Sequence, residues 1–242
     1  SSHGLAQDRA FGVPLDCAVI TYVSREHLDF HRTLKEYFSA KAKIFSLLKP
    51  DGFAVLNRDD KNFPFFAQKV KRKITFGILR GEIRAEKIEY HPEGAEFLLA
   101  TPKGNTRVKL KLPGRFNVYN ALAASAVGVG LGLSLETIRE GLQKVDYVPG
   151  RMEEIRLPNQ PFRVIVDYVH TPDALALVLE ELRQSTKGRV ILVFGMPGQR
   201  DASQRPRMGA VADQGADIVI LTNENQERRK GSFQNPGSRK SD

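Results

Sequence analysis

Residues 25–45 read REHLDFHRTLKEYFSAKAKIF, and no other stretch says as much about the fold and chemistry of this 242-residue chain. Its second half repeats apolar residues at helical spacing, which predicts a helix over residues 34–48 that Pro50 and Gly52 end. Upstream, the apolar run at residues 18–22 predicts a buried strand. The region therefore reads as a strand, a loop and a helix, which is typical of a sheet covered by helices.

The loop within this stretch holds a row of possible metal ligands. His27, Asp29 and His31 occupy alternate positions, and Lys41 follows within the expected helix. Imidazole and carboxylate groups suit a hard divalent ion such as magnesium or manganese. An ammonium group cannot ligate a metal, so Lys41 needs either chemical modification or a phosphate to face. From composition alone, the commoner interpretation of such a loop is a solvated turn.

Strands and helices alternate through the first half of the chain. The pattern predicts strands at residues 53–56 and 73–76 with a short helix between them, and then an antiparallel meander of three strands over residues 83–112. Two helices are expected next, over residues 118–131 and 135–145. The first is rich in alanine and other small residues, so we expect it to pack closely against a neighbour.

After Val148, Pro149 and Gly150 the alternation restarts. Its rhythm is that of a parallel sheet, so we expect an α/β fold in two parts: a mostly parallel sheet with an antiparallel meander, and then a Rossmann-like unit. The expected strands of the second part are residues 163–166, 190–194 and 218–221, and the expected helices are residues 172–183 and 206–214.

Changes in pattern and composition predict the domain boundaries. We expect one domain over residues 1–149 and a second over residues 150–225. Residues 226–242 are rich in Gly, Ser, Asn and basic side chains and have almost no apolar ones. Such a segment cannot offset a backbone-ordering cost of roughly 1–2 kcal/mol per residue, so we expect it to be disordered.

Composition narrows the class of protein. Hydrophobic residues make up 41% and charged residues 27%, as in ordinary globular domains. The single cysteine, Cys17, excludes a disulfide framework and fits a reducing cytoplasm. We find no apolar run of membrane-spanning length and no signal peptide. The net charge of +9 suits a protein that handles nucleotide phosphates, and since no nucleic-acid-binding motif accompanies it we expect no such partner.

A series of short motifs stands in order along the chain, at residues 1–5 (SSHGL), 24–31 (SREHLDFH), 37–45 (YFSAKAKIF), 114–121 (GRFNVYNA), 149–153 (PGRME), 167–174 (DYVHTPDA) and 194–206. Together they resemble the Mur ligase family, specifically its UDP-N-acetylmuramoyl-tripeptide synthetase branch. The resemblance covers nearly the whole chain. It implies a partial central Mur ligase ATPase domain followed by a partial C-terminal domain.

The resemblance also implies an activity, that of an ATP-dependent acid–amino-acid ligase of peptidoglycan synthesis. Such an enzyme activates the carboxylate of UDP-N-acetylmuramoyl-L-alanyl-D-glutamate as an acyl phosphate, which the amine of an amino acid then attacks. The implied cofactors are ATP and Mg²⁺. The implied setting is a cytoplasmic monomer whose partners are UDP-muramoyl-dipeptide and an amino acid, with no membrane and no nucleic acid.

By the same resemblance, His27 and Lys41 are the catalytic and magnesium-binding residues. The lysine is carbamylated in the family, which turns a cation into a carboxylate-like oxygen ligand. The incoming amino acid is held by Arg200, and the UDP-muramoyl-peptide is contacted by Ser1, Gln7 and Arg9.

The implied ATP-binding residues lie in three motifs. Asn120 hydrogen-bonds adenine, Arg151 approaches the nucleotide from the segment joining the domains, Asp167 accepts the ribose hydroxyls, and His170 faces the phosphates. Other interpretations exist for two of them. Asn120 could cap a helix, for which Asn117 is the better placed residue, and His170 could be a surface histidine that caps a helix.

The chain departs from the family in two places. The phosphate loop G-x-x-G-K-[ST] does not occur in its 242 residues, so we expect a fragment that is inactive alone. At residues 224–227 the amino-acid selectivity motif is altered, with Glu227 in place of the arginine that marks diaminopimelate enzymes, so the amino acid cannot be inferred. Two alternatives stay open: a non-catalytic remnant that keeps the fold, and a ligase acting on another acid, such as a folylpolyglutamate enzyme.

Overall fold

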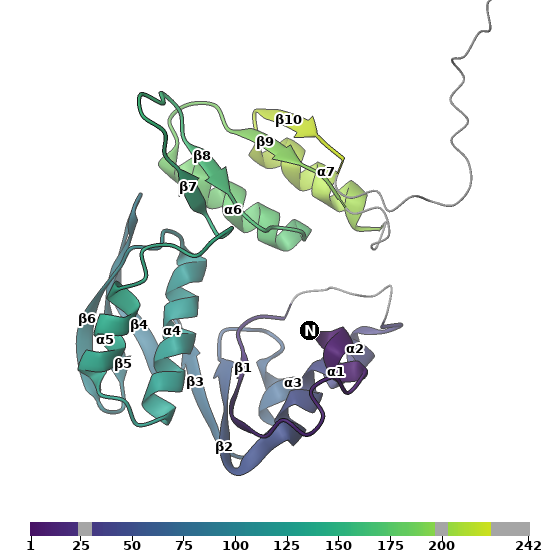
Figure 1. Cartoon of the computed structure of the whole chain (residues 1–242), viewed down its shortest axis with the longest axis vertical. Helices are drawn as coiled ribbons and strands as arrows, with labels where there is room; N and C mark the ends of the chain where they lie inside the picture. Colours follow the sequence, from purple (N-terminus) through teal and green to yellow (C-terminus); the bar gives the residue numbers. More distant parts are fainter. Residues whose placement is uncertain (24–30, 197–202, 224–242) are drawn as a thin grey trace, which may run out of the picture. The chain divides into compact units, whose positions relative to one another are not determined.

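The computed structural model describes residues 1–23, 31–196 and 203–223 (Figure 1). Two compact units follow one another along the chain, Ser1–Val169 and His170–Asp242. The sequence predicts a boundary near Gly150, and the short segment after it forms part of the first unit here. None of the helices in the described part of the chain is long and apolar enough to span a membrane.

A six-stranded sheet forms the centre of the first unit. Strands β1 to β4 are parallel neighbours, whereas β4, β5 and β6 are antiparallel, so the predicted meander is confirmed. The strand order follows the sequence. The strands are β1 (Leu15–Ile20), β2 (Leu48–Asn57), β3 (Lys73–Gly77), β4 (Ile83–His91), β5 (Gly94–Thr101) and β6 (Gly104–Leu110).

Helices cover both faces of this sheet, as parallel strands require. On one face lie α4 (Arg115–Gly130) and α5 (Leu135–Gln143), and on the other lie α2 (Leu34–Ala42), the 3₁₀ helix η1 (Lys43–Leu47) and α3 (Phe63–Ala67). The expected helix over residues 34–48 is therefore too long and too regular. Its last residue already pairs with Leu15 as the first residue of β2.

Strand β2 divides the core into two clusters because successive side chains point to opposite faces. Phe53 and Val55 pack in the cluster that contains α4, and Ala54 and Leu56 pack in the cluster that contains α2 and α3. All four are buried. A Cβ on Gly130 would overlap the Phe53 ring, so the end of α4 packs this closely on β2 only because this residue has no side chain.

Strand β1 is one of the two edge strands of this sheet in the described part of the chain, and it carries the only cysteine in the sequence. Cys17 is half-buried and packs against the α4 side of the core. Burial raises the pKa of its thiol to about 11. The thiol is therefore a small apolar core group at neutral pH.

Two short elements were not expected from the sequence. Helix α1 (Ser2–Ala6) opens the chain, and strand β7 (Glu153–Ile155) pairs antiparallel with β8 (Val164–Val166). Each is shorter than one window of the periodic pattern by which helices and strands are recognised. Both nevertheless position residues that the sequence predicts to be functional.

The second unit alternates helices and strands, as expected. It contains α6 (Pro172–Ser185), β9 (Ile191–Phe194), α7 (Gln204–Gly215) and β10 (Ile218–Leu221), and the two strands are parallel. The two helices share a small core formed by Leu175, Leu179, Met208 and Ala212. The residue pairs Ile191–Ile218 and Val193–Ile220 leave one face of the strand pair with side chains 37–59% exposed.

Candidate functional site

Polar residues gather where the parallel strands β1, β2 and β3 end. This is the edge of an open α/β sheet at which ligands usually bind. After β2, the Asp60 carboxylate accepts a hydrogen bond from the backbone N–H of Val23 at 2.9 Å, and Asn62 Nδ2 donates to the Val23 carbonyl at 3.0 Å. Both hydrogen-bonding groups of Val23 are thereby fixed, immediately before residues 24–30.

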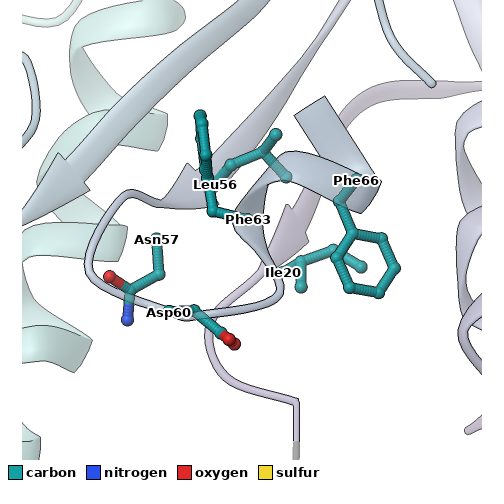
Figure 2. Close-up of a pocket in the computed structure, with 6 residues that line it drawn as sticks. All are labelled: Ile20, Leu56, Asn57, Asp60, Phe63 and Phe66. Atoms are coloured by element: carbon teal, nitrogen blue, oxygen red, sulfur yellow. The ribbon is translucent and has the colours of Figure 1, made fainter. Parts of the chain in front are cut away.

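A small cavity lies beside Asp60 (Figure 2), and its volume is about 10 Å³. That is room for about one water molecule and too little for a substrate. It is lined by Ile20, Leu56, Asn57, Asp60, Phe63 and Phe66. The cavity therefore belongs to the packing around Asp60 and is no ligand pocket.

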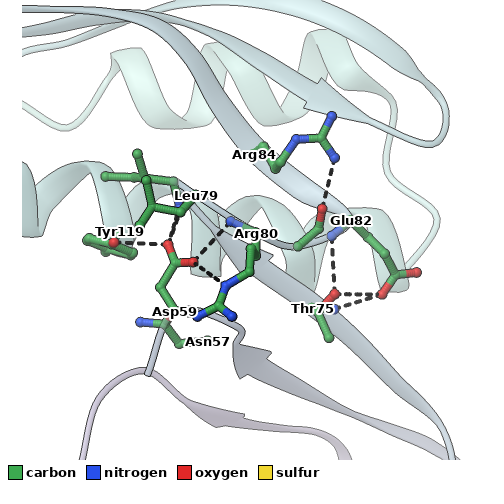
Figure 3. A network of polar contacts seen from close by, with 10 residues as sticks. Asn57, Asp59, Thr75, Leu79, Arg80, Glu82, Arg84 and Tyr119 are labelled. Atoms are coloured by element: carbon green, nitrogen blue, oxygen red, sulfur yellow. Dashed lines mark hydrogen bonds and ion pairs between the residues drawn. The ribbon is translucent and has the colours of Figure 1, made fainter. Parts of the chain in front are cut away.

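Asp59, the preceding residue, is the centre of a polar network (Figure 3). Its carboxylate accepts hydrogen bonds from the backbone N–H groups of Ile78, Leu79 and Arg80 at 2.7, 2.9 and 3.0 Å. The hydroxyl of Tyr119 in α4 donates to the same carboxylate at 3.0 Å. The Asp59 side chain is only 8% exposed. One buried anion thus ties the end of β2, the loop after β3 and the first turns of α4 together.

Burial raises the pKa of the Tyr119 hydroxyl, and its hydrogen bond to Asp59 raises it further. The hydroxyl consequently stays protonated at neutral pH and donates to Asp59. Asn57 supports the arrangement from the end of β2, because its Oδ1 accepts the backbone N–H of Asp59 at 2.9 Å.

Two asparagines lie in the first turns of α4. Gly114 stands at the N-cap of this helix and has no side chain with which to cap it. Asn117 is buried and donates from Nδ2 to the carbonyl of Pro113 at 2.8 Å. Asn120 Nδ2 donates in turn to Asn117 Oδ1 at 3.1 Å. Neither asparagine is the N-cap, so the capping interpretations of both are wrong, and the amide of Asn120 lies at the exposed end of a short hydrogen-bonded row.

A row of rings connects α1 with α2. The His31 ring lies 5.8 Å from that of His3 and 5.5 Å from that of Tyr37, and Lys41 Nζ is 5.0 Å from the Tyr37 ring centroid. His31 and Tyr37 are buried. Helix α2 starts at this row because Thr33 Oγ1 accepts the backbone N–H of Glu36, an N-cap contact. His31 is therefore a packed residue of this row and no part of a solvated turn.

Lys41 alone does not make a metal site. Within residues 1–23, 31–196 and 203–223 the structure contains no group of three or more His, Cys, Asp or Glu side chains able to hold a metal ion. His27 and Asp29 lie outside the described residues. The described residues thus do not by themselves fit a magnesium ion, and we derive no step of the reaction through one.

The three residues expected to contact a muramoyl peptide surround α1. Ser1 is the N-cap, and its Oγ accepts the backbone N–H of Gly4 at 3.1 Å. Gln7 is the C-cap, and the backbone N–H of Arg9 donates to the Gly4 carbonyl at 2.8 Å. A Cβ on Gly4 would lie 3.5 Å from Ser1 Oγ and 3.9 Å from Arg9 Cδ. The side chains of Ser1 and Arg9 therefore flank the same glycine, and all three expected contact residues are exposed.

Arg151 and Asp167 are brought together by the pairing of β7 with β8. Asp167 directly follows β8, and its Oδ2 accepts the backbone N–H of Met152 at 2.8 Å. The Arg151 guanidinium lies 5.4 Å from the ring of Tyr168. Burial raises the pKa of Asp167, although the Met152 N–H and the charge of Arg151 oppose the shift. The backbone accommodates this turn with a positive φ at Gly150 and Met152.

His170 opens the second unit and is exposed. His170 does not cap α6. The N-cap is the next residue, Thr171, whose Oγ1 accepts the backbone N–H of Ala174 at 3.4 Å. Arg200 and residues 224–227, to which amino-acid recognition was assigned, lie outside the described residues, as does the expected tail.

Sequence reasoning missed Asp59, Asp60, Tyr119 and Tyr168. A signal for the first two was present, since Asn57-Arg58-Asp59-Asp60 directly follows a buried strand, where polar residues often serve a site. Tyr119 and Tyr168 stand inside recognised motifs, next to Asn120 and Asp167, but nothing in the sequence distinguishes their role.

Comparison with known proteins supports the two-part organisation. Residues 1–128 match the Mur ligase middle domain, and residues 150–234 match the glutamate ligase domain of Mur ligases. Proteins named UDP-N-acetylmuramoyl-L-alanyl-D-glutamate–2,6-diaminopimelate ligase are 44% identical over 229 residues in Thermosynechococcus vestitus and 42% identical over 234 residues in Bacillus velezensis. These matches cover 93% of this chain but 46% and 47% of the relatives, so the chain spans about half their length.

Solved structures agree in fold. A 2,6-diaminopimelate ligase of the same name matches with a TM-score of 0.66 and 35% identity, over 93% of this chain and 47% of that one. MurF from Acinetobacter baumannii matches with a TM-score of 0.76 and 28% identity, over 85% of this chain and 46% of that one. The α/β fold with its mixed sheet is thus that of known Mur ligases. The match to the Mur ligase middle domain covers more than half of the residues of this chain. The chain therefore belongs to the Mur ligase family.

Proposed function

We propose that the protein containing this chain is an ATP-dependent ligase that adds an amino acid to UDP-N-acetylmuramoyl-L-alanyl-D-glutamate in peptidoglycan synthesis. In the first step an oxygen of the substrate carboxylate attacks the γ-phosphorus of ATP, and ADP leaves. In the second step the amine of the amino acid attacks the acyl carbon of the resulting acyl phosphate, and phosphate leaves. Both relatives described above carry names that state this substrate.

One observation carries the nucleotide part of the proposal, namely that Arg151 and Asp167 converge. They are separated in the sequence, yet the β7–β8 pairing places the Asp167 carboxylate on the backbone next to Arg151. A carboxylate can accept both ribose hydroxyls, and a guanidinium beside it suits phosphate. We assign ribose to Asp167, adenine to Asn120 and phosphate to Arg151 and His170.

The muramoyl peptide is assigned to the exposed surface around α1. Arg9 supplies a guanidinium for a carboxylate or phosphate of the substrate, and Ser1 and Gln7 supply hydrogen-bonding groups on the same short helix. Lys41 lies on the ring row that begins at this helix. A reaction between two anions needs nearby cations, and Arg9 supplies a positive charge on this surface.

We further assign Mg²⁺ to His27 together with carbamylated Lys41. Such an ion would supply positive charge beside the phosphates. The amino acid is assigned to Arg200 through its carboxylate. We propose that the protein acts as a cytoplasmic monomer without a nucleic-acid or membrane partner.

The test is ATP-dependent ligation by the full-length protein. The assay supplies UDP-muramoyl-dipeptide, ATP, Mg²⁺ and 2,6-diaminopimelate, the amino acid in the relatives' names, and follows product and phosphate. We expect Lys41→Ala to lose nearly all activity and a short-chain carboxylate to restore part of it, because the added carboxylate supplies the missing oxygen ligand. Lys43→Ala is the matched control, since Lys43 is exposed and its ion pair at 3.2 Å is with Asp8 on the surface.

Full activity of Lys41→Ala would contradict the assigned role of the carbamylated lysine. Absence of product with the unaltered protein, across a panel of amino acids and with ATP present, would contradict the ligase itself. That second outcome would favour a remnant that keeps the fold without turnover.

A further inference from the structure

Asp59 is a buried anion that the proposed reaction does not use. Its carboxylate accepts three backbone N–H groups from the loop after β3 and one hydroxyl from α4. Three of these donors reach Oδ2 and one reaches Oδ1, and the Arg80 Nε lies 3.9 Å from Oδ1, so the carboxylate is satisfied without any ligand. Its role must therefore be sought in what it holds in place.

What it holds is the start of α4, which needs external support. Gly114 at the N-cap offers no side chain, so the free N–H groups of the first turn are not capped in the usual way. Two side-chain contacts fix this region. Asn117 ties it back to Pro113, and Tyr119 ties it across to Asp59 at 3.0 Å.

Asn120 is next to Tyr119 in the same turn, and its Nδ2 already donates to Asn117 Oδ1 at 3.1 Å. The orientation of the Asn120 amide therefore depends on the rotation of α4 about its axis. It also depends on the hydrogen bonds that link Asn120 to Asn117 and Asn117 to Pro113. Rotating the first turns by a few degrees would redirect this amide. The Asp59–Tyr119 hydrogen bond opposes such a rotation from the opposite end of the Tyr119 side chain.

We propose that Asp59 and Tyr119 are a pair of positioning residues for adenine recognition: their hydrogen bond fixes the first turns of α4 so that the Asn120 amide meets the base edge. The inference rests on the proposed function, in which Asn120 binds adenine. Neither residue contacts the base in this scheme. They act through Asn120, by limiting the directions in which its amide points.

The test uses the full-length protein and its variant Tyr119→Phe, which removes one hydroxyl and keeps the ring. The measured quantity is the preference for adenine over guanine, taken as the ratio of kcat/KM for ATP and GTP and, separately, as the ratio of the affinities for ADP and GDP. We expect this preference to fall about fivefold, the size of one hydrogen bond, with kcat at saturating ATP unchanged. A contact that only stabilised the fold would lower the melting temperature and leave the preference intact.

A double-mutant cycle tests whether the effect passes through Asn120. In an Asn120→Ala background the preference for adenine over guanine should no longer respond to Tyr119→Phe, since the group being positioned is gone. Tyr90→Phe, at an exposed tyrosine in β4, is the matched control and should change neither ratio. Each variant is measured below its own melting temperature, so that all are compared as folded proteins.

An unchanged preference in Tyr119→Phe overturns the inference, and so does an equal drop in both backgrounds. If the unaltered protein binds adenine nucleotides and Asn120→Ala does not weaken them, the assignment of Asn120 fails and the inference fails with it. If the unaltered protein neither binds nor uses ATP, the proposed function itself is refuted. The unaltered protein, the two single variants and the double variant together separate these failures.

Discussion

Gly77 occupies the position where β3 ends and the chain turns over the Asp59 carboxylate. A Cβ there would overlap the carbonyl oxygen of Arg80 and lie 2.7 Å from Asp59 Oδ2. Neither group can move away, because the carboxylate is bound by three backbone N–H groups of the same loop. The loop can close around Asp59 only because this residue has no side chain.

We expect Gly77→Ala to lower the free energy of unfolding by about 1–3 kcal/mol, as overpacking of a fixed site does. Gly141→Ala is the matched control. Gly141 lies in α5 and a Cβ added to it would meet no atom within 4 Å, so alanine should be neutral or stabilise the helix by up to about 1 kcal/mol. Urea unfolding of both variants measures the difference. Equal stabilities would mean that the loop relaxes and that the Asp59 contacts are weaker than their distances imply.

The candidate site residues can be named from the sequence because they stand in motifs, but the contacts around them cannot. Asn120, Arg151 and Asp167 were named from their motifs. The contacts that orient them come from residues far away in the chain, such as Asp59 for the helix that carries Asn120. A local sequence pattern does not indicate which distant loop will contact a given side chain. For the same reason the buried environment of His31 was not foreseen.

At the scale of elements, an ion pair joins two segments of the second unit. Asp217 Oδ2 accepts the backbone N–H of Val190 at 2.6 Å and lies 2.9 Å from an Arg183 nitrogen. It thus joins the end of α6 to the starts of β9 and β10. These contacts, the Val190 N–H first and Arg183 second, hold the pKa of Asp217 below its ordinary value of 3.8.

We expect Asp217→Ala to lower the melting temperature of the second unit at neutral pH. A carboxyl group whose pKa is lowered by folding stabilises the fold above its ordinary pKa, and this contribution is lost as the pH falls below 3.8 toward the folded value. The difference from the unaltered protein should therefore shrink in acid. Asp213→Ala, at an exposed position of α7, is the control and should have little effect. A difference that stays constant down to about pH 2 would contradict the ionic origin.

Elements longer than two helical turns were predicted well, because the periodic pattern is long enough to be read. The helices at α4, α5, α6 and α7 and the antiparallel meander are where the sequence predicts them. The sequence predicts one helix over residues 34–48, where the structure has α2, η1 and the start of β2, because apolar residues continue across all three. The pairing of Leu48 with Leu15 decides that boundary, and it is a tertiary contact.

At the scale of the whole molecule, apolar side chains on one face of the β9–β10 pair are exposed. The pairs Ile191–Ile218 and Val193–Ile220 leave these side chains 37–59% accessible, although parallel strands are normally covered on both faces. The family and the α/β class could be inferred from the sequence because ordered motifs and strand–helix alternation extend over the whole chain. How completely each sheet is covered could not, because coverage depends on packing between distant segments.

The alkylation rate of the half-buried Cys17 thiol can report how often strand β1 separates from the core. Only the thiolate reacts with alkylating reagents, and with a pKa of about 11 the Cys17 thiol is ionised at about pH 8 to the order of one part in a thousand. We expect alkylation in buffer to be slower than in denaturant by on the order of a hundredfold, since an unfolded thiol has a pKa of about 8.5. Equal rates would mean that β1 is detached from the core. Because the sequence contains one cysteine, a single mass increment measures how often β1, one of the two edge strands of the described sheet, opens.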